Sequence, residues 1–365
     1  MVDEKVLNDV KEFCEELRPT EDVHYLEHEY NEETIPLAKE HDLMGLPVPR
    51  EYGGRGVDEM TYIKALERIG MEGSGIRTIF SVHTSLFQKI LMHFGSDRQK
   101  QEYLKPSASG DILGAYALTE PEAGSDPMAM ETTYTEEDGH YILNGSKYLI
   151  SNAGIADAII VFAKDQEGII SAFVIDADQQ GIEVEDLVSK MGTPTTNTGM
   201  FDMKDLKVPK ENMIGGKKDG WRIAMDGLID GRLGVAAGCV GSMKDCLVEA
   251  SEYAKEREQH GKPIAKHQLV QEHIAEIKTK YEAARQLLYR AVEKKQEWEE
   301  DRSNQELRDA ADQAVSEAKF YAARVSYEAA DRGVQIYGGR GWSFLYRPGR
   351  HLVDNRVTRI YEGSE

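Results

Sequence analysis

The sequence contains only three cysteines in 365 residues, Cys14, Cys239 and Cys246. A set that is both odd and sparse provides no disulfide framework, so we expect a reducing, cytoplasmic environment. In a helical stretch, Cys239 and Cys246 would lie roughly 10 Å apart along the helix axis, which is too far for a disulfide or a shared metal ion.

Long apolar runs and an excess of positive charge are also absent. No apolar segment approaches the ~20 residues that cross a bilayer, and the acidic start Met1-Val2-Asp3-Glu4 is unlike a signal peptide. The 65 Asp and Glu residues outnumber the 44 Lys and Arg residues, for a net charge of −21. We therefore expect no membrane partner and no nucleic-acid partner, whereas small anionic ligands are compatible with this charge because they respond to a local field.

Several common catalytic motifs are missing. No Gly-x-Gly-x-x-Gly follows a predicted strand, and the chain has no Walker A loop and no Gly-x-Ser-x-Gly elbow. One metal pattern is present, because His24-Tyr25-Leu26-Glu27-His28 matches His-x-x-Glu-His. A solvated acidic helix explains these residues better, since nothing marks a third ligand or a cleft. We therefore predict no metal site.

The length predicts two or three domains, and the residue pattern changes twice along the chain. Residues 1–114 have apolar positions three and four apart, as in Leu86, Ile90, Leu91 and Phe94, which is typical of helices. Residues 115–219 alternate with a period of two, which predicts a small antiparallel barrel or sandwich. Within this region, residues 140–144 and 147–151 flank Gly145 like a hairpin, and 158–163 and 169–175 are apolar strands.

Helices return in residues 220–365 and are longer. Residues 266–296 and 306–332 are nearly free of Gly and Pro, with a turn expected at 301–304. A stripe of small and apolar residues on the second of these helices predicts packing against its neighbours: Leu307, Ala311, Ala314, Ala318, Ala322, Val325 and Ala329. The sequence therefore predicts an α+β protein that ends in an antiparallel four-helix bundle.

Polar, glycine-rich segments punctuate this framework. The first, Tyr116-Ala117-Leu118-Thr119-Glu120-Pro121-Glu122-Ala123-Gly124-Ser125-Asp126, is a strand that enters a turn. Its backbone N–H groups, with Thr119 and Ser125, could cradle a phosphate or the polar edge of a ring, although by spacing alone a well-capped turn is favoured. The others are Asn144-Gly145-Ser146-Lys147, Ile150-Ser151-Asn152-Ala153, Arg257-Glu258-Gln259-His260-Gly261, His267-Gln268, Gln335-Ile336-Tyr337-Gly338-Gly339-Arg340-Gly341 and Arg359-Ile360-Tyr361-Glu362-Gly363-Ser364-Glu365.

In this order and spacing, these segments resemble the acyl-CoA dehydrogenase family. The resemblance covers essentially the whole chain, including Pro49-Arg50-Glu51-Tyr52-Gly53-Gly54 near its start. It implies a helical domain, a β-barrel and a helical bundle, with FAD as cofactor and an acyl-CoA thioester as substrate. It also implies an electron-transfer flavoprotein as redox partner and a homotetramer in which FAD is partly shared between subunits.

The resemblance further assigns roles to individual residues. Leu118, Thr119 and Ser125 match positions that hold the flavin and its pyrophosphate, and Ser125 also lies near CoA. Ser151 matches the residue that hydrogen-bonds flavin N5, while Leu149 stands where relatives usually have Trp against the flavin. The remaining matched cofactor positions are Arg257, Gln259, His267 and Gln268, which face FAD, Gln335, Gly338 and Gly339, which reach the partner subunit's FAD, and Ser364.

Glu362 matches the catalytic base, and Tyr361, Gly363 and Arg232 match substrate-binding positions. The α-C–H next to a thioester is a weak acid, so its removal needs a base whose pKa is raised by burial. The β-hydrogen would leave as hydride to flavin N5, with hydrogen bonds to the thioester oxygen stabilising the enolate-like charge. Some relatives place the base just before the residue matched by Arg232, but here that residue is Gly231.

Arg77 and Thr78 bear on the acyl group, because glutaryl-CoA dehydrogenases have Arg followed by Ser at this point. Asp126-Pro127-Met128-Ala129-Met130-Glu131-Thr132 also looks like that branch. An Arg at the distal end of the acyl pocket would pair with a terminal carboxylate. Alternatively, Arg77 pairs with Glu67 or Glu72 for a structural reason. We expect glutaryl-CoA as substrate, with a short or branched acyl-CoA as the alternative, and an oxygen-using oxidase or a non-catalytic scaffold as weaker ones.

Overall fold

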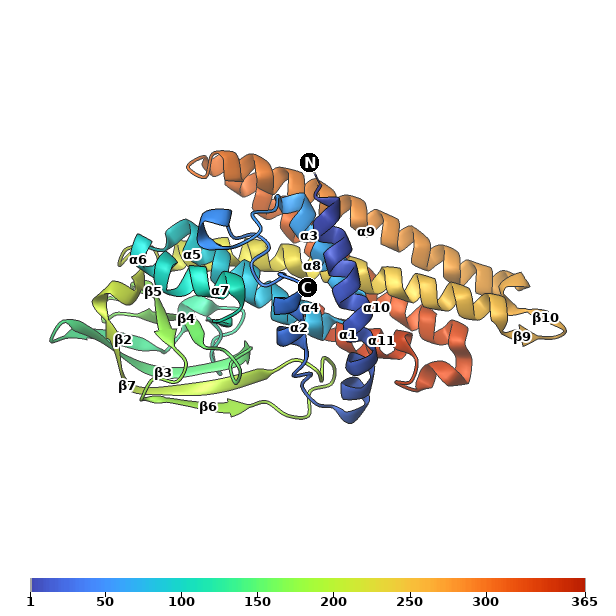
Figure 1. Cartoon of the computed structure of the whole chain (residues 1–365), viewed down its shortest axis with the longest axis horizontal. Helices are drawn as coiled ribbons and strands as arrows, with labels where there is room; N and C mark the ends of the chain where they lie inside the picture. Colours follow the sequence, from blue (N-terminus) through green and yellow to red (C-terminus); the bar gives the residue numbers. More distant parts are fainter. Residues whose placement is uncertain (1, 365) are drawn as a thin grey trace.

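The chain has helical N-terminal and C-terminal regions with a β-sheet between them in the sequence. The computed structural model describes residues 2–364. Figure 1 shows the sheet at one end of an elongated molecule, while the long C-terminal helices run from the sheet to the opposite end. The two helical regions share one hydrophobic core, which joins Phe13 and Leu66 to Val240 and Leu288.

The N-terminal region consists of helices of different lengths, and polar side chains cap the starts of α1, α3 and α6. The Asp3 side chain accepts hydrogen bonds from the backbone N–H groups of Lys5 and Val6 at the first turn of α1. The helices are α1 (Glu4–Glu27), α2 (Thr34–Glu40), α3 (Glu59–Gly70), α4 (Ser74–Ser81), α5 (Lys89–Phe94), α6 (Asp97–Gln99) and α7 (Lys105–Ser109), with π-helical turns at Val82–Gln88 and Lys100–Leu104.

The sheet runs in the order β6-β7-β3-β2-β4-β5-β8, and β1 pairs with β4 as well. Its strands are β1 (Gly114–Ala117), β2 (Thr133–Glu137), β3 (His140–Ser151), β4 (Ala158–Lys164), β5 (Ile170–Asp176), β6 (Ile182–Asp186), β7 (Thr198–Pro209) and β8 (Met213–Ile214). Most neighbours are antiparallel, but β1 and β2 both pair with β4 in parallel.

Two expectations for this region were wrong. The sheet is not a closed barrel, because β6 and β8 lie at opposite ends of the strand order. Strand β6 is exposed and carries Glu183 and Glu185, and charges on an edge strand oppose further pairing. Gly145 is not a hairpin turn either: β3 runs through it with a bulge, and φ is 146°. A Cβ at Gly145 would lie 2.5 Å from Thr132 Oγ1, so close packing also requires glycine there.

The C-terminal region is an antiparallel helical bundle, as predicted. Its helices are α8 (Gly220–Glu256), α9 (Gln268–Glu300), α10 (Gln305–Tyr337) and α11 (Arg347–Thr358), and the small strands β9 (Glu258–Gln259) and β10 (Lys262–Pro263) join α8 to α9. The turn between α9 and α10 falls at the expected residues, 301–304. The predicted stripe on α10 faces the core, with Ala311, Ala318 and Ala322 fully buried.

Helices α3 and α8 approach each other closely because glycines line their contact. A Cβ at Gly241 would lie 2.1 Å from the carbonyl oxygen of Glu67, and a Cβ at Gly70 would lie 2.6 Å from Cα of Gly238. The main chains of the two regions therefore touch directly at this point. This contact brings α4, which carries Arg77 and Thr78, against the bundle.

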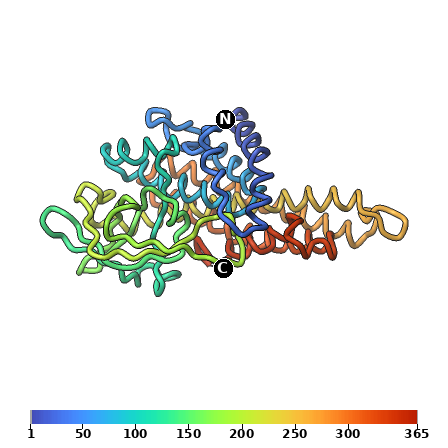
Figure 2. The backbone as a smooth tube through the Cα atoms, turned by 60° about the horizontal axis from the view of Figure 1, so that its bottom comes forward, coloured from blue at the N-terminus to red at the C-terminus, as the bar shows by residue number. Residues whose placement is uncertain are grey.

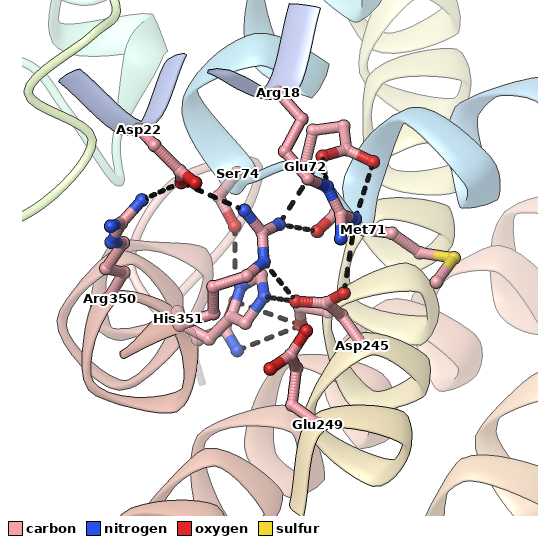
Figure 3. Close-up of polar contacts among 12 residues, drawn as sticks. Arg18, Asp22, Met71, Glu72, Ser74, Asp245, Glu249, Arg350 and His351 are labelled. Atoms are coloured by element: carbon pink, nitrogen blue, oxygen red, sulfur yellow. Dashed lines mark hydrogen bonds and ion pairs between the residues drawn. The ribbon is translucent and has the colours of Figure 1, made fainter. Parts of the chain in front are cut away.

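A buried network of charges also joins the two regions (Figure 3). Arg347 on α11 donates to Asp245 on α8 with Nε 2.7 Å from Oδ2, and it lies 3.6 Å from Glu72. His351 approaches the same oxygen of Asp245 at 2.8 Å, while Arg18 on α1 forms two hydrogen bonds to Glu72. Burial alone would raise the pKa of Asp245, but Arg347 and His351 outweigh it and hold the pKa well below its usual range.

Within the described residues, no helix combines the length and hydropathy needed to cross a membrane. The three cysteines are buried, and none is paired in a disulfide.

Arg347→Met is expected to lower the free energy of unfolding by about 3–5 kcal/mol, because it leaves Asp245 buried without its main partner. Urea denaturation at neutral pH measures this. The wild-type contribution of Asp245 is fully present above the unfolded carboxyl pKa of about 3.9 and is lost as pH falls below it. Lys204→Met is the matched control, because Lys204 forms an exposed ion pair with Glu183 at 2.9 Å. Equal midpoints for the two variants would contradict the assignment.

Candidate active site

Glu362 lies in the tail that follows α11, and its carboxylate packs against α8. A Cβ at Gly231 would lie 2.6 Å from Oε2 of Glu362, so only glycine leaves room for this carboxylate. Oε2 is shielded from solvent and has no hydrogen-bond partner. Burial raises the pKa of Glu362 to about 7, against the opposing charges of Arg232, Lys319 and Arg77. The backbone of Glu362 is left-handed, with φ of 54°, a conformation that residues other than glycine rarely adopt.

Two cations hold the tail by its backbone. Arg232 Nε donates to the carbonyl oxygen of Glu362 at 3.0 Å, and its NH1 donates to Asp312 at 2.8 Å. Lys319 on α10 donates to the carbonyl oxygen of Gly363. Both cations therefore bind carbonyl groups of the tail, and Arg232 forms its ion pair with Asp312. A cavity of about 260 Å³, the tail cavity, is lined by Arg232, Ser316, Lys319, Phe320, Glu362, Gly363 and Ser364.

Arg77 is the other buried charge near Glu362. The side chain is 1% exposed, and its NH1 donates to Ser81 Oγ at 2.8 Å. Its NH2 donates to the hydroxyl of Tyr361, the residue next to Glu362. Its Nε is buried and has no hydrogen-bond partner. A guanidinium held in this way can accept an anionic ligand, because its charge is not neutralised locally.

The alternative that Arg77 pairs with Glu67 or Glu72 is wrong. Glu67 lies 3.1 Å from Arg285 and accepts a hydrogen bond from Tyr289. Glu72 is bound by Arg18, Arg68 and Arg347. Both carboxylates therefore have other cations as partners, and among the described residues Arg77 forms no ion pair with a carboxylate.

Four of the predicted site residues meet at a second cavity, of about 320 Å³, the central cavity. Thr78 comes from α4, Leu149 and Ser151 from the end of β3, and Tyr361 from the tail. Leu149 is 49% exposed and has a left-handed backbone, with φ of 58°, at a bulge in β3. The rest of the wall consists of residues 187–198 and one side of α11. Three separate regions of the chain therefore converge on one cavity.

The turn after β1 lies beside this end of β3. The carbonyl oxygen of Thr119 accepts a hydrogen bond from the backbone N–H of Tyr148 at 2.9 Å, and that of Leu118 accepts one from Lys147 Nζ at 3.2 Å. Lys147 also forms a buried ion pair with Glu120 at 2.7 Å. Ser125 is exposed at the end of the turn. The segment 118–125 is therefore fixed next to Leu149, although it does not line the central cavity.

The other predicted cofactor residues lie far from both cavities in this chain. Arg257, Gln259 and His267 lie in the segment between α8 and α9 that contains β9 and β10, and Gln268 begins α9. Gln335 lies near the end of α10, and Gly338 and Gly339 follow it. Figures 1 and 2 both show the β9–β10 tip at the end of the bundle opposite the sheet. Most of these side chains are exposed. In one chain, the predicted site residues therefore form two groups, one at the two cavities and the other at the end of the bundle opposite the sheet.

Some cavity residues escaped the sequence analysis. Residues 187–198 join β6 to β7 and contribute Lys190, Thr193, Thr196 and Thr198 to the central cavity. Burial lowers the pKa of Lys190 to about 8. The available signal was the run of threonines after Gly192. On α10, Asp312, Ser316 and Lys319 recur at helical spacing, which marks one polar face.

The His-x-x-Glu-His pattern does not bring its two histidines together on one site. Ligand atoms of His24, Glu27 and Glu29 lie within 4.8 Å of one another, but His28 is outside this group. His28 instead ends α1 with φ of 58°.

Comparison with known proteins covers nearly the whole chain. The N-terminal, middle and C-terminal domain families of acyl-CoA dehydrogenase match residues 3–111, 115–206 and 218–365. An acyl-CoA dehydrogenase of Bacillus subtilis is 38% identical over 97% of this chain and 92% of its own length. A short-chain-specific acyl-CoA dehydrogenase of Clostridium acetobutylicum is 36% identical over 100% and 93%. Caffeyl-CoA reductase-Etf complex subunit CarC of Acetobacterium woodii is 36% identical over 97% of this chain and 92% of its own length.

Solved structures agree. Butyryl-CoA dehydrogenase from Megasphaera elsdenii superimposes with a TM-score of 0.93 and 36% identity, covering 99% of this chain and 94% of that one. A glutaryl-CoA dehydrogenase in complex with glutaryl-CoA superimposes with a TM-score of 0.89 and 32% identity, covering 99% of this chain and 91% of that one. An acyl-CoA dehydrogenase from Bacillus anthracis complexed with FAD superimposes with a TM-score of 0.88 and 32% identity, covering 99% of this chain and 65% of that one. The chain belongs to the acyl-CoA dehydrogenase family and is an oxidoreductase of that family.

Proposed function

We propose that this protein, with FAD bound, removes an α- and a β-hydrogen from an acyl-CoA thioester, with Glu362 as the base. The observation that carries the proposal is the carboxylate of the half-buried Glu362, whose Oε2 is shielded from solvent and unpaired and whose pKa is raised to about 7. A carboxylate in this state accepts a weakly acidic proton much better than an exposed one, because the carboxylate form is destabilised by burial.

The central cavity suits the flavin of FAD. Its walls combine apolar side chains such as Leu149 and Ile360 with the hydroxyls of Thr78 and Ser151, and the buried Thr196 Oγ1 has no partner. An unpartnered buried hydroxyl beside a cavity needs a polar atom of a ligand. Thr78, Ser151 and Thr196 would therefore hold polar atoms of the ring, and Leu149 would contact its face. When bound, FAD supplies an acceptor for the hydride that leaves the β-carbon.

The tail cavity suits the approach of the thioester. Arg232 lines it next to the Glu362 backbone, and its Nε and NH1 are both engaged, which keeps the tail in place. Glu362 takes the α-proton at its carboxylate, and Gly231 provides the space in which that carboxylate sits.

The environment of Arg77 favours a substrate whose acyl chain ends in a carboxylate, and glutaryl-CoA is the leading candidate. Its charge is buried without an anionic partner, and its NH2 contact with Tyr361 places it one residue from the proposed base. A terminal carboxylate on the acyl chain would complete the hydrogen bonding of this guanidinium. The solved glutaryl-CoA dehydrogenase complex supports this assignment.

A short-chain acyl-CoA is the second candidate. It is favoured by the similarity to the Clostridium acetobutylicum and Megasphaera elsdenii enzymes, which are named for short-chain and butyryl substrates. For such a substrate Arg77 would have no ligand to bind, and Tyr361 and Ser81 would be its only partners.

The cofactor site requires a second copy of the chain in this proposal. Arg257, Gln268 and Gln335 lie at the tip of the bundle, away from the central cavity, so they would act on the FAD of a neighbouring subunit in a homotetramer. An electron-transfer flavoprotein would accept the electrons, which the relative from an Etf complex supports. Leu149 is exposed at the central cavity, so the flavin edge would be reachable by such a partner.

Glu362→Gln is expected to retain FAD and to lower kcat with any acyl-CoA by at least about 10⁴-fold, because glutamine cannot accept the α-proton. The flavin spectrum reports cofactor content, and an artificial electron acceptor reports turnover. Glu293→Gln, an exposed change on α9, is the control and should behave as wild type. Near-normal turnover by Glu362→Gln would refute its role.

The pH dependence follows from the raised pKa. Below pH 7 Glu362 is increasingly protonated and cannot act as a base, so kcat/KM should rise with pH and level off above about 7. A steady-state profile of kcat/KM between pH 5 and 9 measures this, because the range covers the titration of a group with a pKa of about 7 on both sides. A flat acid limb down to pH 5 would be inconsistent with a buried Glu362 base.

Arg77→Met is expected to raise KM for glutaryl-CoA by about tenfold to hundredfold, because the terminal carboxylate loses a charge-assisted partner. Turnover of butyryl-CoA should be retained. Steady-state kinetics with each thioester and an artificial electron acceptor give KM and turnover, and anaerobic flavin bleaching shows which thioester reduces the flavin. If wild-type protein is bleached by butyryl-CoA and not by glutaryl-CoA, the carboxylate assignment is wrong.

A further inference from the structure

The side chain of Arg77 reaches its position only because residue 238 on α8 has no side chain. A Cβ at Gly238 would lie 2.7 Å from Arg77 Nε, 3.0 Å from Cδ and 3.1 Å from Cγ. These are the three nearest atoms, and all belong to Arg77. They lie in the middle of the side chain, not at its free end, so Arg77 cannot relieve the contact by moving its guanidinium alone.

The surroundings fix Arg77 from the other sides. Its NH1 is bound to Ser81 one turn along α4, and its NH2 to the Tyr361 hydroxyl. The aliphatic part lies on Gly238, and the whole residue is 1% exposed. Because protein interiors are closely packed, one added methyl group at this contact would require a different rotamer for Arg77.

We infer that Gly238 is a specificity-determining positioning residue: it holds the Arg77 guanidinium against Tyr361, the position in which the proposed function uses it to bind a carboxylated acyl chain. Gly238 acts through Arg77 and contacts neither substrate nor cofactor in this account. The inference rests on the proposed preference for a carboxylated acyl-CoA, and it explains how helix α8 contributes to that preference from a position that carries no functional group.

The consequence for selectivity is asymmetric. A carboxylated thioester depends on the guanidinium, so displacement of Arg77 weakens its binding. An uncharged short acyl chain does not need Arg77, and the base, Glu362, packs on Gly231 about two turns earlier on α8. A change at residue 238 should therefore alter KM for one substrate class and leave kcat for the other unchanged.

The test compares Gly238→Ala with Gly227→Ala, both in FAD-loaded protein. Gly227 is a buried glycine on the same helix, and a Cβ there would lie 3.0 Å from Cδ1 of Ile90, the end of a flexible side chain. Steady-state kinetics with glutaryl-CoA and butyryl-CoA give KM and kcat separately. Gly238→Ala is expected to raise KM for glutaryl-CoA by about tenfold to hundredfold, with kinetics for butyryl-CoA unchanged. Gly227→Ala should leave the ratio of the two substrates at its wild-type value.

A crystal structure of Gly238→Ala provides the readout that does not depend on substrate. The inference expects Arg77 in a new rotamer, without its bond to Tyr361. Arg77 in its present position, or an unchanged KM for glutaryl-CoA, would overturn the inference while leaving the proposed function intact. Wild-type protein that does not use glutaryl-CoA would overturn the proposed substrate and the specificity role together. If Gly238→Ala does not fold, Gly238→Ala with Arg77→Ala in one chain should fold, because alanine at residue 77 lacks the three atoms that the new Cβ would meet. Failure of that variant to fold would overturn the inference as well.

Discussion

The ion pair between Arg347 on α11 and Asp245 on α8 determines where the chain leaves the bundle and enters its C-terminal tail. Buried charges are costly to desolvate, and this pair is stable because Glu72, His351 and Arg18 complete the network around it. Since α11 leads directly to Tyr361 and Glu362, the position of the proposed base depends on this contact. The same network attaches α1 and the α3–α4 turn, so the helix that carries Arg77 is fixed by it too.

The tail is held by cations that bind its backbone. Arg232 and Lys319 donate to the carbonyl oxygens of Glu362 and Gly363. Arg232, Lys319 and Arg77 lower the pKa of Glu362 by their charge, but burial outweighs them and the pKa stays raised, at about 7. The left-handed backbone of Glu362 is a strained conformation that costs on the order of 1–3 kcal/mol, which the anchoring contacts offset.

Periodicity predicted the helices well, because α9 and α10 bury one continuous face along almost their whole length. It failed at Gly145, since a glycine between two alternating segments marks a bulge as readily as a turn. Glu362 could not be chosen from spacing alone among 65 acidic residues, and only the resemblance singled it out. The threonines of 187–198 and the partners of Arg77 depend on contacts between segments far apart in sequence, which no local pattern contains.

The central claim is that Glu362 removes an α-proton from the acyl-CoA thioester. The most direct test is NMR measurement of hydrogen–deuterium exchange at the α-carbon of butyryl-CoA incubated with the FAD-loaded protein in D₂O. The account predicts exchange catalysed by wild-type protein, faster above pH 7 than below it, and none above background with Glu362→Gln. Equal exchange by wild-type protein and Glu362→Gln would contradict it.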